Sequence, residues 1–235
     1  MGKLFKKLKE DVRFTHGLHA CINCGTCTAI CPAASFYDYD PREITDQLQV
    51  EDDQVLEELL TGEKIWFCGQ CMSCKTRCPR GNTPGLLILA LRNLSINSGL
   101  YMKSTRGRQM YVLKKMVGDT ILSKGYCVYP DNVDPELFPE QGPIWSWVMK
   151  YRSEVFNRFG DSYRKEGDGP VRKIPESALE EIRKIFDVTG STERFRQLEE
   201  DASRYADDLG IDYDDTVLND YFFLQYEGKK NAHES

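Results

Sequence analysis

The segments CINCGTCTAICP (21–32) and CGQCMSCKTRCP (68–79) share one cysteine spacing, C-x2-C-x2-C-x3-C, and each ends in proline. Together they hold eight of the nine cysteines of the 235-residue chain. This run is typical of iron–sulfur ligation, because cysteines three residues apart let a tight loop reach three corners of a cubic cluster. Small residues lie inside the loops at Gly25, Gly69 and Ser73. The repeat therefore predicts two [4Fe–4S] clusters.

We expect the fourth cysteine of each run to serve the other cluster. In two-cluster proteins this cysteine points away from its own loop and ligates the neighbouring cluster. One cluster would then be held by Cys21, Cys24, Cys27 and Cys78, and the other by Cys68, Cys71, Cys74 and Cys31. The exchange would tie the two loops together and hold the clusters close to each other, as an electron relay requires.

A zinc-stabilised scaffold protein is the alternative from another functional class. Structural zinc sites with four thiolates usually take two C-x2–4-C pairs separated by a spacer. Two runs of three cysteines at successive +3 positions, each followed by a fourth at +4, fit that pattern poorly.

Composition excludes several other classes. The formal net charge of −6 and the pI of about 5.3 argue against a general nucleic-acid binder. The odd cysteine count and the basic N-terminus without an apolar core argue against a secreted disulfide scaffold. The longest apolar run, 86–91, is far shorter than the roughly 20 residues that span a bilayer. We expect a cytoplasmic protein with no direct membrane span.

The pattern of apolar residues predicts a mainly α-helical protein. Asp40 can cap a helix that starts at Pro41, breaks near 51–53 and ends at 61–62. A second helix is predicted from Thr83-Pro84 to about Gly99. Further helices are expected at about 105–118, 176–188 and 191–209, with a proline-rich loop over 130–143.

The 36-residue spacer between the runs (32–67) reads as helix, and in this the chain resembles the α-helical ferredoxin domain. More specifically, it resembles the C subunit of heterodisulfide reductase over roughly residues 15–100. The segments that carry this resemblance are DYDPREI (38–44), LQ (48–49), VLEELLTGEKIWFC (55–68), CPRG (78–81) and LLILALRNL (86–94).

The resemblance implies an electron-transfer protein that relays single electrons between the A subunit, which carries flavin and iron–sulfur centres, or a membrane partner, and the disulfide-active B subunit. It divides the chain into a basic N-terminal segment (1–14), an α-helical ferredoxin domain (15–100) and a helical, loop-rich extension (101–235) that docks partners. This extension exceeds what we expect of the methanogen type. It resembles the heterodisulfide-reductase-like complexes of sulfur oxidisers, in which a lipoate-binding protein is the proposed sulfur carrier.

An iron–sulfur subunit of a glycerol-3-phosphate, glycolate, lactate or succinate dehydrogenase is a further alternative. Such relatives often carry cysteine-rich domains or a plant-type two-iron domain, whereas only Cys127 lies beyond residue 78 here. We find no Gly-rich dinucleotide fingerprint, P-loop or Ser/His/Asp set, and therefore expect no catalytic residues.

Other residues receive simpler interpretations. Cys127 is expected to be a buried, inert thiol, and His16 and His19 are not expected to be ligands. Trp145 and Trp147 are expected to anchor the proline-rich loop, with partner docking as the alternative. The acidic run 199–220 is expected to be a solvated helix face. A basic belt is formed by five residues, and it is also expected to be a solvated helix face, with binding to an acidic redox partner as the alternative. Its residues are Lys103, Arg106, Arg108, Lys114 and Lys115.

Overall fold

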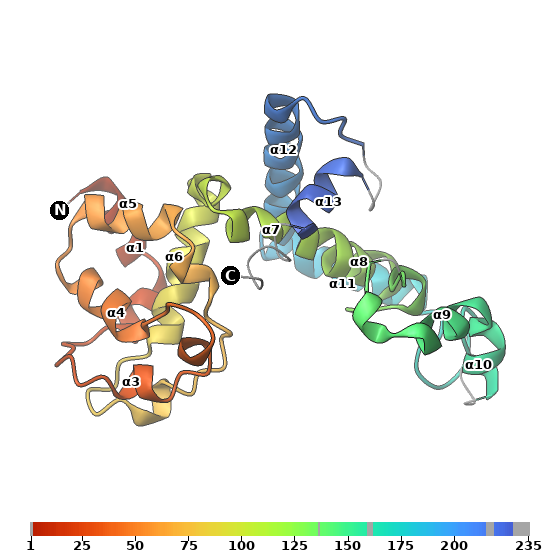
Figure 1. Cartoon of the computed structure of the whole chain (residues 1–235), viewed down its shortest axis with the longest axis horizontal. Helices are drawn as coiled ribbons and strands as arrows, with labels where there is room; N and C mark the ends of the chain where they lie inside the picture. Colours follow the sequence, from red (N-terminus) through yellow and green to blue (C-terminus); the bar gives the residue numbers. More distant parts are fainter. Residues whose placement is uncertain (1, 136, 159–161, 215–218, 228–235) are drawn as a thin grey trace. The chain divides into compact units, whose positions relative to one another are not determined.

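The computed structural model describes residues 2–135, 137–158, 162–214 and 219–227. It divides into two compact units, Met1–Arg108 and Gln109–Ser235. The regular elements within these ranges are helices (Figure 1), and the only β pairing in them is an isolated antiparallel bridge between Tyr163 and Arg172. The predicted mainly α fold is confirmed. None of the helices described is both long and apolar enough to cross a bilayer.

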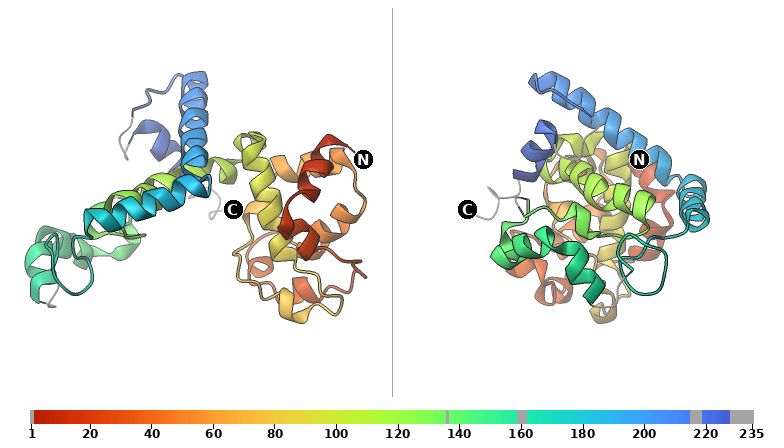
Figure 2. Two further views of the ribbon diagram at one scale, coloured as in Figure 1. Left: turned by 180° about the vertical axis from the view of Figure 1, so that it is seen from behind. Right: turned by 90° about the vertical axis from the view of Figure 1, so that its right-hand side faces the viewer.

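Unit 1 is built around helix α6 (Pro84–Asn97), which contacts the four other longer helices of the unit. Figure 2 shows α6, in yellow, among them. Its Leu87, Ile88, Ala90 and Leu91 are fully buried. The remaining helices of unit 1 are α1 (Lys3–Lys9), α2 (Val12–Gly17), α3 (Thr26–Ala29), α4 (Pro41–Gln49) and α5 (Asp53–Thr61), with 3₁₀ turns at Ala33–Ser35, Lys64–Trp66, Lys75–Arg77 and Leu100–Lys103.

The spacer between the cysteine runs folds as two helices, and the predicted break between them is confirmed. The Asp40 side chain accepts hydrogen bonds from the amides of Arg42 and Glu43 and so caps α4. Glu51 then adopts a left-handed backbone (φ 56°), which ends α4 and lets Asp52 cap α5.

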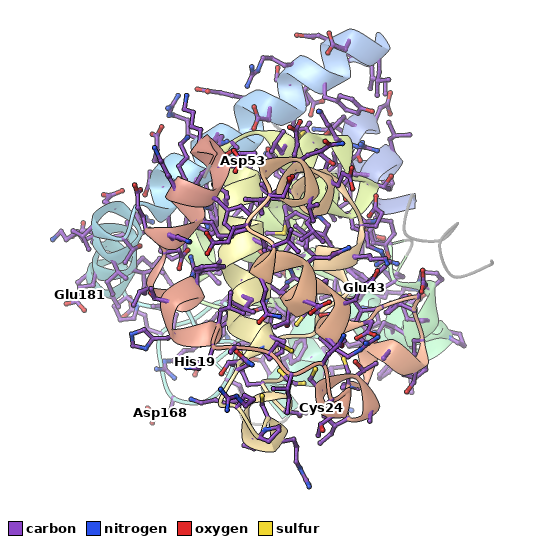
Figure 3. The ribbon with its side chains drawn as sticks, turned by 90° about the vertical axis from the view of Figure 1, so that its left-hand side faces the viewer. His19, Cys24, Glu43, Asp53, Asp168 and Glu181 are labelled. Carbon is purple, nitrogen blue, oxygen red and sulfur yellow. The ribbon has the colours of Figure 1, made fainter. Side chains whose placement is uncertain are left out.

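The N-terminal helix α1 contributes to the core of unit 1. Phe5 and Leu8 are buried there, and the Asp53 carboxylate (Figure 3) accepts hydrogen bonds from the amides of Leu4 and Phe5, both at 3.1 Å. The division into 1–14, 15–100 and 101–235 stays a prediction.

Unit 2 contains the helices predicted at 176–188 and 191–209, which are α11 (Glu176–Val188) and α12 (Ser191–Leu209). The predicted helix at 105–118 runs further than expected, through α7 (Thr105–Leu113), a π-helical turn (Lys114–Gly118) and α8 (Asp119–Lys124). Two helices that the sequence did not predict follow Gly142, and a last one lies near the C-terminus: α9 (Pro143–Lys150), α10 (Arg152–Arg158) and α13 (Asp220–Glu227). The proline-rich loop contains 3₁₀ turns at Pro130–Asn132 and Pro139–Gln141.

The prediction of a fully solvated basic belt is wrong for Lys114 and Lys115, whose side chains are only 9% and 5% exposed. Both pair with Glu199 of α12, and the Lys115–Glu199 distance is 2.9 Å. Glu199 also accepts a hydrogen bond from the Tyr213 hydroxyl. The acidic run is therefore not a solvated face at Glu199, nor at the buried Asp201, because these carboxylates lie where α12 packs within unit 2.

Three further expectations meet mixed outcomes. Cys127 is exposed rather than buried, because the aromatic rings around it, Tyr126 and Tyr129, pack against each other (5.5 Å between centroids). The helical spacing of the sequence puts Ile185 on the same apolar face of α11 as Leu179, yet Ile185 is 57% exposed. The Trp145 indole donates to the Val133 carbonyl (3.0 Å), which supports its anchoring role, whereas Trp147 is 53% exposed.

Candidate iron–sulfur site

The two cysteine loops have the same backbone conformation. Asn23 and Gln70, at corresponding positions, are both left-handed (φ 57° and 56°), and so are Gly25 and Met72 (φ 77° and 58°). In each loop the left-handed residue turns its amide back, so that Asn23 N–H donates to Cys21 Sγ and Gln70 N–H to Cys68 Sγ, both at 3.4 Å. The sequence repeat is thus a repeat of conformation, with amides already directed at sulfur.

The four cysteines predicted to hold the first cluster line a single cavity. Cys21, Cys24 and Cys27 come from the first run, and Cys78 comes from the second. In Figure 3, sulfur atoms lie near the labelled Cys24 at the end of unit 1 that also carries His19. The other lining residues include Arg42, Arg80, Asn82 and Pro84.

Helix α4 fixes the first loop in place. Gln49 Oε1 accepts a hydrogen bond from the amide of Cys21 (2.7 Å), and the Arg42 guanidinium donates to Asn23 Oδ1 (2.6 Å). The Thr28 hydroxyl donates to Asp40, the N-cap of the same helix. Sequence reasoning missed the role of Gln49. The only indication of this role in the sequence was the LQ pair at 48–49, which belongs to the family resemblance.

The cysteines predicted to hold the second cluster lie around Tyr39 and the start of α6. Cys31 and Cys68 pack against the core of unit 1, which includes Tyr39. Burial, and then the negative charges of Cys68 and Cys31, raise the pKa of Tyr39, which places its hydroxyl beside both thiols. Burial raises the pKa of Cys74, and the negative charges of Cys68 and Cys71 raise it further. Cys74 also accepts a hydrogen bond from the Gly85 amide, which acts in the opposite direction.

The two loops also share an electrostatic pattern. The middle cysteine of each is exposed, and hydrogen bonds from Thr26 to Cys24 and from Ser73 to Cys71 lower the pKa of each thiol. Burial instead raises the pKa of Cys27, the third cysteine of the first loop, as it does that of Cys74. Because the thiolate is the form that binds metal, the middle cysteines are the readiest ligands.

This donor set fits iron–sulfur clusters better than single ions. In the part of the chain that the structure describes, no three His, Cys, Asp or Glu side chains come close enough to hold one metal ion. A zinc ion would draw four thiolates to about 2.3 Å from one point. The four cysteines of the first set surround a cavity instead, as the corners of a cubic cluster would require.

Two buried hydrogen-bond donors support the fit. Asn82 Nδ2 lacks a partner among the described residues and belongs to a side chain that lines the first cavity. The buried Tyr39 hydroxyl also has no hydrogen-bond partner among those residues. Because buried donors are nearly always satisfied, cluster and thiolate sulfur are the acceptors that each site offers.

Comparison with known proteins identifies the family. A family model described as a 4Fe-4S dicluster domain matches residues 17–82. The chain is 34% identical over 178 residues to the C subunit of ferredoxin:CoB-CoM heterodisulfide reductase from Methanosarcina acetivorans, over 74% of this chain and 68% of that protein. This chain belongs to the family of heterodisulfide reductase C subunits.

Two other relatives are C subunits by name as well. The second iron-sulfur C subunit of CoB–CoM heterodisulfide reductase from Methanocaldococcus jannaschii is 34% identical over 66% of this chain and 76% of its own length. The C subunit of H(2):CoB-CoM heterodisulfide,ferredoxin reductase from Methanothermobacter marburgensis is 28% identical over 193 residues, 80% of this chain and 85% of that protein. These matches are longer than residues 15–100, so the likeness to methanogen proteins extends beyond the motifs that first indicated it.

The family assignment confirms that the chain is an iron–sulfur electron-transfer subunit with [4Fe–4S] clusters, and the dicluster domain fits two of them. It favours this family over the dehydrogenase alternatives and over a zinc scaffold. Arg92, whose Nη2 donates to the Cys68 carbonyl (2.7 Å), lies beside the cysteines together with the buried Asn82 and Tyr39, and no motif pointed to these three residues. A single arginine in the apolar stretch LLILALRNL was the one available signal.

Proposed function

We propose that this chain relays single electrons through two neighbouring clusters within a heterodisulfide-reductase-like complex. The electrons pass between the A subunit, which carries flavin and iron–sulfur centres, and the disulfide-active B subunit. The observation that carries the proposal is the cavity shared by Cys78 and the three cysteines of the first run. Such sharing supports crossed ligand sets, in which the two cluster-binding loops are held side by side.

The ligand sets of this proposal follow the crossed pairing. Cys21, Cys24, Cys27 and Cys78 bind one cluster, and Cys68, Cys71, Cys74 and Cys31 bind the other. Each bound cluster supplies reversible one-electron chemistry. The chain itself contributes thiolates and backbone amides.

The N-terminus of α6 adjoins both sets. Pro84 lines the first cavity, and the amide of Gly85 donates to Cys74 of the second set. The partial positive charge at a helix N-terminus stabilises nearby negative charge. Since four thiolates make each site anionic, α6 supports both sites from one position.

The partners and the location belong to the same proposal. The B and A subunits are the electron-transfer partners, bond chemistry takes place in a partner, and the complex is cytoplasmic without nucleic acid. The relatives described above are named for the CoB–CoM heterodisulfide, whereas the sequence pattern pointed to sulfur oxidation with a lipoate-binding protein. The proteins that co-purify with this chain distinguish the two.

Anaerobic purification of the native protein tests the proposal. We expect about eight irons and about eight sulfides per chain, given two four-iron clusters, together with co-purifying B and A subunits. Zinc without acid-labile sulfide would overturn the cluster assignment. A fully loaded protein that purifies with a glycerol-3-phosphate, glycolate, lactate or succinate dehydrogenase would overturn the choice of complex.

A further inference from the structure

The two cysteine sets differ in the charge that surrounds them. Arg92 of α6 lies beside the second set, where its Nε donates to the Ile65 carbonyl and its Nη2 to the Cys68 carbonyl, both at 2.7 Å. The guanidinium also lies 5.4 Å from the centroid of the Trp66 ring. Among the residues described, no carboxylate pairs with it, so this partly buried cation has carbonyls and an aromatic face as its neighbours.

A buried cation without a counter-ion is costly unless an anion lies nearby. Burial lowers the pKa of Arg92, and the negative charge of the Cys68 thiolate opposes this effect. A [4Fe–4S]²⁺ core with four thiolates carries a net charge of about −2, and one-electron reduction makes it more negative. Arg92 is therefore placed to stabilise the reduced form more than the oxidised form.

Tyr39 adds a second contribution on the same side. Its side chain is only 4% exposed and packs edge-to-face on Phe67, the residue before Cys68 (6.3 Å between ring centroids). Its buried hydroxyl has no hydrogen-bond partner among the residues the structure covers, and Cys68 and Cys31 pack against the same core, so cluster or thiolate sulfur is the acceptor that this side of the site offers. A hydrogen bond to sulfur spreads the charge of the reduced cluster and favours reduction.

Among the residues described, the first set has no cation placed as Arg92 is. Arg42 adjoins it but pairs with the Asp40 carboxylate (2.8 Å), which leaves little net charge, and the nearby Asp40 charge contributes to the raised pKa of Cys27. Arg80 lines the cavity but is exposed to solvent, which screens its charge. Asn82 supplies one neutral donor.

We propose that Arg92 and Tyr39 raise the reduction potential of the cluster at Cys31, Cys68, Cys71 and Cys74 above that of the cluster at Cys21, Cys24, Cys27 and Cys78. An electron shared between the two clusters then resides on the Cys68 side. This inference rests on the ligand sets of the proposed function. It adds which of the two clusters has the higher reduction potential.

The test is an EPR-monitored redox titration of the full chain with both clusters assembled anaerobically. Arg92→Gln is expected to lower one midpoint potential by an amount equivalent to at least a tenfold change in the reduction equilibrium, about 59 mV for one electron, and to leave the other unchanged. Arg92→Lys, which keeps the charge, is expected to retain most of the wild-type potential. Lys103→Gln, which removes an exposed cation of unit 1 that pairs with Glu57, is the control and is expected to shift neither midpoint appreciably.

Tyr39→Phe provides an independent measurement should Arg92→Gln fail to assemble clusters, and it is expected to lower the same midpoint by a smaller amount. The EPR signal altered in Cys71→Ser identifies the second cluster. Unchanged potentials in Tyr39→Phe and Arg92→Gln, or equal shifts in both clusters, would overturn the inference. A wild-type chain without eight irons would instead overturn the proposed function, so the two failures are distinguishable.

Discussion

Gln49 Oε1 accepts a hydrogen bond from the backbone amide of Cys21 at 2.7 Å, and this bond joins the last residue of α4 to the first cysteine of the chain. It makes the position of the first cluster loop dependent on a helix that follows that loop in the sequence.

We predict that Gln49→Leu destabilises the first loop, because the substitution leaves the partly buried Cys21 amide without its acceptor. Such a loss costs about 1 kcal/mol. Denaturant unfolding of the cluster-loaded chain measures the effect, and Gln47→Leu on the same helix is the control. A variant as stable as the control, with an unchanged EPR signal from the first cluster, would contradict this role for Gln49.

Crossed ligation predicts that Cys78→Ser damages the cluster bound by Cys21, Cys24 and Cys27, since Cys78 lines their cavity. Conversely, Cys31→Ser is expected to damage the cluster of the second run. EPR of the reduced proteins distinguishes the two signals. Damage in Cys78→Ser that is confined to the cluster of Cys68, Cys71 and Cys74 would exclude the crossed arrangement.

Glu199→Gln is expected to lower the free energy of unfolding by about 3 kcal/mol at neutral pH, because it leaves Lys114 and Lys115 buried without their shared anion. Burial acts to raise the pKa of Glu199, but hydrogen bonds from Lys114, Tyr213 and Lys115 outweigh it and lower that pKa below its usual value. A carboxyl with a lowered folded-state pKa stabilises the protein above its unfolded-state pKa, and this stabilisation is lost as the pH falls through the folded-state value.

The stability difference between wild type and Glu199→Gln should therefore stay constant between about pH 8 and pH 6 and shrink only in the acid range of a carboxyl group. Denaturant unfolding at several pH values measures it. Glu193→Gln, on the exposed side of α12, is the control and should change stability much less. A difference that titrated near pH 7 would contradict the assignment to Glu199.

The exposed Cys127 should react with a maleimide in the cluster-loaded protein, whereas the eight cluster ligands should be protected. We expect one modified thiol per chain under anaerobic conditions, located by peptide mass spectrometry, and none in Cys127→Ser. Labelling of Cys31 or Cys78 in a fully loaded protein would show that it is not a ligand.

Local signals made much of unit 1 predictable. Asp40-Pro41 and Thr83-Pro84 mark helix starts within a few residues, and both helices begin there. The cysteine spacing likewise indicated the cofactor without any knowledge of the tertiary structure. Both the helix starts and the cluster-binding loops are determined by residues that lie within a few positions of each other in the chain.

Contacts between segments that are distant in the chain could not be predicted from the sequence. Lys114 looks like part of a solvated belt until its partner Glu199, 85 positions away, is brought beside it. Arg92 and Tyr39 become site residues only because packing of α6 and the spacer places them beside Cys68. Helix α9 escaped prediction because the prolines up to Pro143 suggested loop, although proline is well suited to the first turn of a helix.

The left-handed residues of the two loops bear on how the cofactor is acquired. Asn23, Gln70 and Met72 are not glycines, and the left-handed conformation costs about 1–2 kcal/mol for such a residue. Ligation free energy must offset this cost, because metal binding and local folding are coupled. Loss of a cluster therefore removes the free energy that holds these residues left-handed, and the loops, rather than the helices, carry that cost.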